Sequence, residues 1–100
     1  MTFSPADMTG KAVIVTGAAA GLGKVTAVKL AQAGARLCIV DVNADGLEET
    51  AKELRELGAD LRVAVADLAD TAHCGRLVDS TVAQFGGLHA LCNIAAVLLP

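Results

Sequence analysis

The sequence of 100 residues has little of what several classes of protein require. It has no Tyr, no Trp and two Phe, and its eight Lys and Arg stand against eleven Asp and Glu, for a formal charge of −3. Without a basic patch interleaved with aromatic side chains, the composition does not favour nucleic-acid binding. No apolar run approaches the roughly 18 residues that a membrane span needs. We therefore expect no nucleic-acid partner and no membrane partner.

Cysteine usage and the amino-terminal segment disfavour two further classes. Cys38, Cys74 and Cys92 are odd in number and far apart, without the spacing of zinc ligands. We expect small buried thiols in a reducing compartment, and no metal site. Residues 1–9 are interpreted as a loose leader that lacks the basic region and apolar core of a secretory signal. The expected localisation is therefore cytoplasmic.

Apolar residues, by contrast, are abundant. They make up 54% of the chain, with ten glycines in addition, whereas ordinary domains reach about 45–50% with glycine included. Such an excess is typical of strands buried on both faces, as in a parallel sheet with helices on either side. We assign residues 10–100 to part of a single domain.

Apolar runs and helical stripes alternate along the chain. Strands are expected at residues 10–16, 36–40, 61–66 and 89–94, with helices at about 21–33, 45–58 and 70–85. Asn43 or Asp45 can cap the second helix; Asp45 and Glu48 resemble a capping box, and Glu48–Lys52 is a favourable pair. Right-handed crossovers then predict an α/β fold. It is a doubly wound parallel sheet in the order 3-2-1-4, incomplete at the edge of strand four.

A glycine-rich segment, residues 16–23, lies between the first strand and the first helix. Gly17 lets the chain turn sharply, Gly21 lets a phosphate approach the backbone, and Gly23 lets the helix lie close to the strand. The N–H groups of the first helical turn then form an anion site suited to a pyrophosphate. The alternative is a tight turn that binds nothing, which the strand-to-helix context disfavours.

Polar side chains follow the other strands at the same edge of the sheet, where ligands of such folds bind. Asp41 can accept hydrogen bonds from both hydroxyls of an adenosine ribose, and Asp67 can face an adenine amino group. Helix capping or a solvated strand end is the alternative for Asp41, and a turn carboxylate is the alternative for Asp67, since Asp70 is better placed to cap. Asn93 either ties strands together or contacts the nucleoside. His73 and His89 are expected away from this edge.

These residues resemble the cofactor motif of the short-chain dehydrogenase/reductase family, from Gly10 onward. The resemblance implies a Rossmann-like, NAD-binding fold. Its implied cofactor contacts are Gly17, Ala20, Gly21, Leu22, Gly23, Asp41, Asp67, Leu68, Asn93 and Ala95. The Gly21-Leu22 backbone would meet the pyrophosphate, Asp41 the ribose, Asp67-Leu68 the adenine, and Asn93 with Ala95 the neighbouring ribose. The last segment departs from the family's Asn-Asn-Ala-Gly, because Ile94 and Ala96 replace its second Asn and its Gly.

The family transfers a hydride between a nicotinamide and an alcohol or ketone, using a Tyr-x-x-x-Lys pair and a Ser. Because this chain has no Tyr, the resemblance implies the NAD-binding part of an oxidoreductase whose catalytic residues lie beyond residue 100. Residues 1–100 alone are expected to be inactive. Two alternatives stay open: a non-catalytic NAD-binding regulatory module, and an S-adenosylmethionine methyltransferase, whose glycine loop is normally tighter. The expected partner is a small-molecule alcohol or ketone, and a homo-oligomer is a further option.

Overall fold

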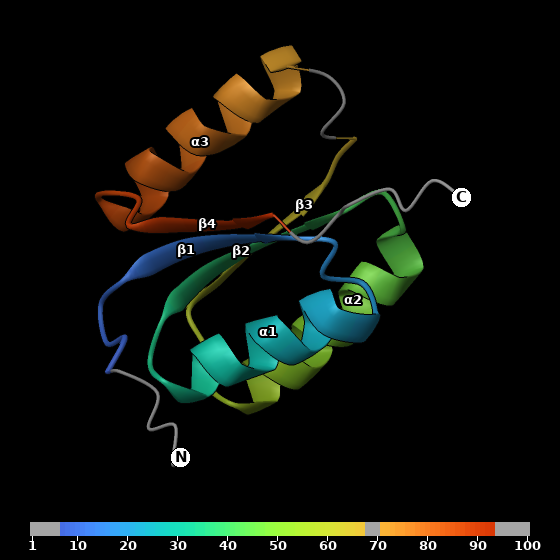
Figure 1. The fold of residues 1–100 in the computed structure, drawn as a ribbon, viewed down its shortest axis with the longest axis vertical. Coiled ribbons are helices and arrows are strands. Elements are labelled where there is room, and N and C mark those ends of the chain that lie inside the picture. The colour runs from blue at the N-terminus through green and yellow to red at the C-terminus, as the bar shows by residue number, and fades with distance from the viewer. Residues whose placement is uncertain (1–6, 68–70, 94–100) are drawn as a thin grey trace.

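Helices and strands alternate along the chain in a computed structural model that describes residues 7–67 and 71–93. The elements are β1 (Ala12–Thr16), α1 (Gly21–Gln32), β2 (Arg36–Asp41), α2 (Ala44–Glu56), β3 (Leu61–Val65), α3 (Thr71–Phe85) and β4 (Ala90–Asn93). Figure 1 shows three layers, with α1 and α2 on one face of the sheet and α3 on the other. The expected β-α-β-α-β-α-β order is confirmed.

The four strands are parallel and lie in the order β3-β2-β1-β4, as predicted. Thr16 at the end of β1 is in register with Val40 of β2 and Asn93 of β4. Asp41 at the end of β2 is in register with Val65 of β3. The carboxyl ends of all four strands therefore lie along one edge of the sheet, and the segments that follow β1 and β2 meet there (Figure 1).

The two faces of the sheet contribute to two apolar clusters. All five residues of β1 are buried, and alternate residues of a strand point to opposite faces. The face towards α1 and α2 contributes Val13, Val15, Leu37 and Ile39. The face towards α3 contributes Ile14, Cys38 and Val40, which pack with Leu77. The burial of β1 and β2 on both faces accounts for part of the high apolar fraction of the sequence.

Cysteine behaves only partly as expected. Cys38 is buried, whereas Cys74 and Cys92 are half-buried, and none of the three forms a disulfide. Burial raises the pKa of the Cys38 thiol, which is opposed by its hydrogen bond with Thr81 and by Arg62. A thiol of raised pKa in an apolar layer is unreactive, so Cys38 acts as a packing residue.

The start of α2 differs from one expectation. Asn43 caps the helix, because its Oδ1 accepts a hydrogen bond from the Gly46 N–H at 3.0 Å. Asp45 lies within the first turn of the helix, so the capping box of Asp45 with Glu48 was wrong. Glu48 pairs with Arg55 at 2.8 Å instead of with Lys52. Arg55 lies two helical turns further along the same face, and its long side chain spans that distance.

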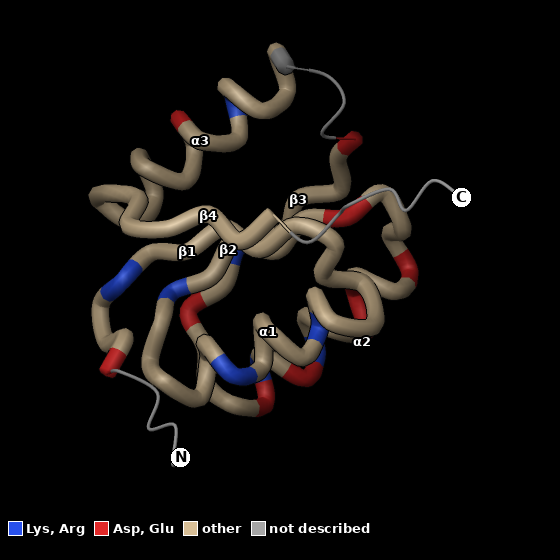
Figure 2. Tube along the Cα trace, in the orientation of Figure 1, with Lys and Arg blue, Asp and Glu red and all other residues tan. Residues whose placement is uncertain are grey.

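Charge is concentrated outside the sheet. In Figure 2 the charged positions gather along α2 and at the turns, and few lie on the strands. Lys24 of α1 pairs with Glu53 of α2 at 3.2 Å, which joins the two helices on one face. Within the ranges that the structure describes, none of the helices has the length and hydropathy that crossing a bilayer would take.

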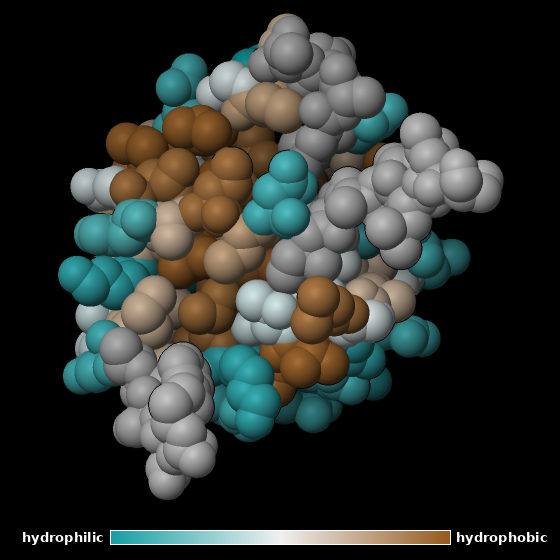
Figure 3. All heavy atoms as spheres, in the orientation of Figure 1, coloured by the Kyte–Doolittle hydropathy of each residue, from teal (hydrophilic) through white to brown (hydrophobic). Residues whose placement is uncertain are grey.

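The edge at β4 is open in the described sheet, because β4 pairs with β1 alone. Leu91 of this strand is 57% exposed. Figure 3 shows apolar side chains on the face of the molecule where β4 lies in Figure 1. This agrees with the expectation of a sheet that is incomplete at strand four.

Candidate cofactor site

The turn from β1 into α1 has the backbone that its glycines predict. Gly17 and Gly21 have φ angles of 67° and 57°, in the left-handed region that side chains other than hydrogen disfavour. A Cβ at Gly23 would clash with the carbonyl oxygen of Gly17, whereas a Cβ at Gly21 would meet no atom within 4 Å. Gly23 therefore permits close packing, and Gly21 borders open space.

The start of α1 has no side-chain cap of its own. Its N-cap residue is Ala20, which has no side-chain oxygen, and no acidic residue follows in the first turn. Ala20, Gly21 and Leu22 are exposed. The first N–H groups of a helix lack partners within the helix and carry the positive end of its dipole. This arrangement is suited to an anion such as a phosphate.

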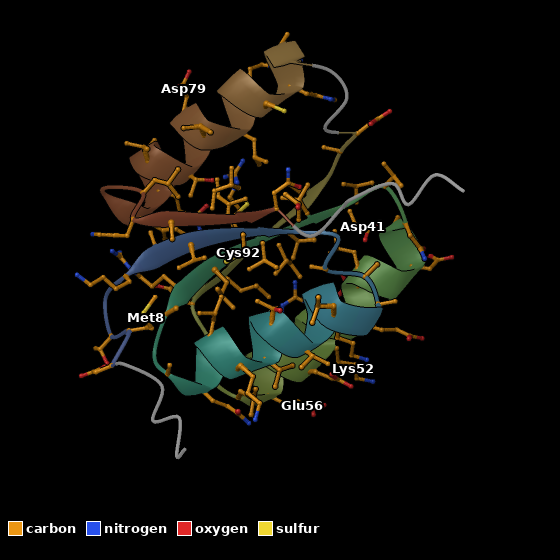
Figure 4. All side chains as sticks on the ribbon, viewed as in Figure 1. Met8, Asp41, Lys52, Glu56, Asp79 and Cys92 are labelled. Atoms are coloured by element: carbon orange, nitrogen blue, oxygen red, sulfur yellow. The ribbon has the colours of Figure 1, made fainter. Side chains whose placement is uncertain are left out.

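Asp41 lies beside this turn, as Figure 4 shows. Its Oδ2 accepts a hydrogen bond from the Ala19 N–H at 3.0 Å, and its Oδ1 accepts one from the Asn43 N–H at 3.0 Å. A carboxylate has about four acceptor positions, so these two bonds leave capacity for two hydroxyl donors. The structure thus brings Asp41 and the glycine turn together and fixes the carboxylate in place.

Asn93 meets Thr16 across the sheet. The Thr16 hydroxyl donates to Asn93 Oδ1 at 2.9 Å and lies 3.4 Å from the carbonyl oxygen of Cys92. Of the two alternatives for Asn93, the structure shows the one that ties β4 to β1. Contact with a nucleoside through the other end of the amide stays a prediction.

The remaining predicted contacts are only partly described. Asp67 is exposed and follows β3. The Ala66 N–H donates to the Asp41 carbonyl oxygen at 3.1 Å, so the segment after β3 begins next to Asp41. Leu68 and Ala95 lie outside the described residues.

The histidines lie at different ends of the sheet. His89 is at the amino end, where its Nδ1 accepts a hydrogen bond from the Ala12 N–H at 2.9 Å. His73 lines a groove with Val65 and Ala66 at the end of β3, so the expectation that it lies away from the carboxyl edge was wrong. The cause is that α3 begins just after β3 ends. In the described part of the chain, no three potential metal-binding side chains cluster.

Thr50 of α2 is a residue of this region that was not predicted from the sequence. This residue is buried, and its hydroxyl donates to the carbonyl oxygen of Ala18 in the glycine turn at 2.8 Å. The available signal was a polar residue on the buried stripe formed by Leu47, Ala51 and Leu54.

Known proteins are similar to this chain in sequence and in fold. The family model "short chain dehydrogenase" matches residues 11–99. A 1-deoxy-11-beta-hydroxypentalenate dehydrogenase of Streptomyces avermitilis is 42% identical over 87 residues, which cover 87% of this chain and 32% of the relative. Levodione reductase of Leifsonia aquatica is 38% identical over 99 residues, which cover 96% of this chain and 37% of the relative.

A solved structure gives the same result for the fold. The crystal structure of a short chain dehydrogenase from Mycobacterium paratuberculosis bound to NAD has a TM-score of 0.88 and 29% identity, and the match covers 94% of this chain and 40% of that one. The chain thus spans about a third of the length of the curated relatives that it matches. Since these relatives are named dehydrogenases or reductases, neither the regulatory module nor the methyltransferase receives support.

Proposed function

The chain belongs to the short chain dehydrogenase family, and from this premise we propose that it is the NAD-binding part of an oxidoreductase acting on an alcohol or ketone. One observation carries the choice of cofactor. Asp41, a fixed carboxylate, lies beside a helix start that has no side-chain cap. A diphosphate joined to an unphosphorylated ribose matches this pair of features.

The pyrophosphate is assigned to the start of α1. The backbone N–H groups of Gly21 and Leu22 donate hydrogen bonds to the pyrophosphate in this proposal. Gly17 and Gly23 allow the turn to adopt its shape. Lys24 is engaged with Glu53 of α2 and is not needed for this role. The open space around Gly21 fits the group, because a side chain at that position would occupy it.

We assign the adenosine ribose to Asp41, whose carboxylate accepts a hydrogen bond from each of the two ribose hydroxyls. A 2′-phosphate, as in NADP, removes one hydroxyl and places like charges together. Asp67 and Leu68 are proposed at the adenine, and Asn93 and Ala95 at the neighbouring ribose. Ala20 borders the pyrophosphate.

The bound nicotinamide would supply the hydride chemistry, and the residues of this chain bind and orient the cofactor. We assign no catalytic residue within the 100 residues. The proton donor is proposed to be a Tyr of a Tyr-x-x-x-Lys pair in further sequence of the whole protein. A cytoplasmic location, a small alcohol or ketone as substrate and association into a homo-oligomer stay predictions.

Calorimetric titration of the full reading frame with NAD, NADP and S-adenosylmethionine tests the proposal. We expect NAD to bind most tightly. Tighter binding of S-adenosylmethionine, or no binding of NAD by protein that has a native circular dichroism spectrum, would contradict it. A full reading frame without a Tyr-x-x-x-Lys pair would contradict the assignment as an enzyme.

A further inference from the structure

Thr50 makes an unusual hydrogen bond for a threonine within a helix. A buried Thr hydroxyl commonly donates to the carbonyl oxygen four residues earlier, and Thr81 of α3 does so with Leu77 at 2.8 Å. The Thr50 hydroxyl lies 3.3 Å from the equivalent oxygen, that of Gly46, but 2.8 Å from the carbonyl oxygen of Ala18. Because a hydroxyl has one hydrogen to donate, the shorter bond, to the glycine turn, is the principal one.

The bond completes a set of contacts around two buried residues. The Ala18 N–H donates to the Val40 carbonyl oxygen at 3.2 Å, and its own carbonyl oxygen accepts from Thr50. The next residue, Ala19, donates its N–H to Asp41. Both alanines are buried. The first half of the turn is therefore held by β2 and α2 together.

The second half of the turn is exposed and connects the held first half to α1. Ala20, Gly21 and Leu22 are exposed, and Gly21 has the permissive backbone of a glycine with positive φ. The peptide planes that present N–H groups to an anion thus lie between this held first half of the turn and helix α1, which begins at Gly21. A binding site held in its bound geometry avoids part of the entropy cost of association.

We propose that Thr50 is a positioning residue for the cofactor. By holding the Ala18 carbonyl group, it fixes the turn so that the N–H groups of Gly21 and Leu22 face the pyrophosphate. Thr50 itself touches no cofactor. This inference rests on the proposed NAD binding.

Two substitutions separate the hydroxyl from the methyl group of Thr50. Thr50→Val keeps the shape and removes the donor, whereas Thr50→Ser keeps the donor and removes the methyl group. Thr81→Val is the control, because it removes a buried hydroxyl whose partners, the Leu77 carbonyl oxygen and the Cys38 thiol, lie outside the glycine turn. All three variants are made in the full reading frame, and thermal melts establish that each one folds.

The first measurement is NAD affinity by calorimetry. We expect Thr50→Val to weaken NAD binding on the order of 5- to 10-fold, the effect of one net hydrogen bond. Thr50→Ser should stay within about 2-fold of the unaltered protein, and Thr81→Val should leave affinity unchanged at a similar loss of stability. Equal affinities in Thr50→Val and Thr81→Val would overturn the proposal, as would a failure of Ser to restore binding.

The second measurement needs no cofactor. Hydrogen exchange of the Ala18 and Ala19 amides, followed by NMR, should be faster in Thr50→Val and unchanged in Thr81→Val. Unchanged exchange in Thr50→Val would overturn the positioning role even if NAD binds. Absence of NAD binding by the unaltered protein would instead overturn the proposed function, and this inference with it, whatever the exchange rates show.

Discussion

Helices α1 and α2 begin at the same edge of the sheet, but their first turns are completed differently. In α2, Asn43 accepts the hydrogen bond of the Gly46 N–H, and Asp45 places a negative charge in the first turn. In α1, the N-cap is Ala20 and the first turn has no acidic residue. The start of α2 is capped by its own side chain, whereas the N-cap residue of α1 makes no side-chain cap hydrogen bond. The difference supports our assignment of the pyrophosphate to the start of α1 more directly than the glycines alone.

The start of α1 is proposed to bind the cofactor but provides no catalytic group. The largest expected effect is therefore the absence of dehydrogenase activity in residues 1–100. Oxidation of a secondary alcohol by NAD requires a group within hydrogen-bond reach that accepts the hydroxyl proton, and that donates it when a ketone is reduced; the family uses a Tyr, and the chain has none. We expect residues 1–100 to form no NADH from a panel of secondary alcohols, while the full reading frame turns over. His73 lies nearest the carboxyl edge of the two histidines, so His73→Ala in the full reading frame is the control and should stay active. Turnover by residues 1–100 would contradict the assignment.

A side chain at Gly21 should prevent a phosphate from reaching the start of α1. Gly21→Val occupies the open space next to the α1 terminus and strains a backbone with φ of 57°. We expect NAD affinity to fall by about 100-fold or more, through lost phosphate contacts of about 1.5–3 kcal/mol each. Calorimetry measures this loss.

Gly58 offers a matched control for that experiment. It also has a positive φ, 77°, with no atom within 4 Å of a built Cβ, but it lies beyond the far end of α2. Gly58→Val should cost a similar amount of stability, about 1–2 kcal/mol, and leave NAD affinity unchanged. Equal NAD affinity in the two variants would mean that the phosphate lies elsewhere.

Asp41 should determine the choice between NAD and NADP. Like charges 4 Å apart cost about 4 kcal/mol at an effective dielectric constant near 20, so we expect NAD to be preferred by about 100-fold or more. Asp41→Ala should reduce the difference in affinity between NAD and NADP, chiefly by weakening the binding of NAD. Asp45→Ala is the control, because that carboxylate is exposed in the first turn of α2. Tighter binding of NADP by the unaltered protein would contradict the prediction.

Much of the fold and part of the site were predictable from local patterns. The order of strands followed from alternating elements and the handedness of crossovers, and the roles of Gly17 and Gly23 followed from their spacing. The bonds of Asp41 to the Ala19 N–H and of Thr50 to Ala18 were not predictable, because they join residues 22 and 32 positions apart. Such contacts depend on how β2 and α2 pack against the turn.

The cap of α2 shows where local chemistry leaves a choice. Asn43 and Asp45 are both suitable N-cap residues. The structure selects Asn43 because β2 ends at Asp41, whose Oδ1 accepts from the Asn43 N–H. That bond holds Asn43 in an extended conformation, with φ −82° and ψ 95°, from which its side chain reaches Gly46.

The smallest expected effects come from exchanging the two kinds of helix start. Ala20 already has the extended backbone of an N-cap, with φ −161° and ψ 172°, so Ala20→Asp can accept a hydrogen bond from the first turn of α1. This should raise the free energy of unfolding by about 1 kcal/mol. It should also weaken NAD several-fold, because the new carboxylate competes with the pyrophosphate for the same N–H groups and repels its charge.

The reciprocal change is Asn43→Ala, which removes the cap of α2 and should lower the free energy of unfolding by about 1 kcal/mol. Its NAD affinity should stay unchanged, because the Asn43 side chain caps Gly46 of α2 and the bond to Asp41 comes from the backbone N–H, which alanine keeps. Urea unfolding gives the stability and calorimetry the affinity of each variant. In Ala20→Asp, a higher free energy of unfolding together with a lower NAD affinity would indicate that the start of α1 binds the cofactor. A gain in stability with unchanged affinity would show that the start of α1 is merely uncapped.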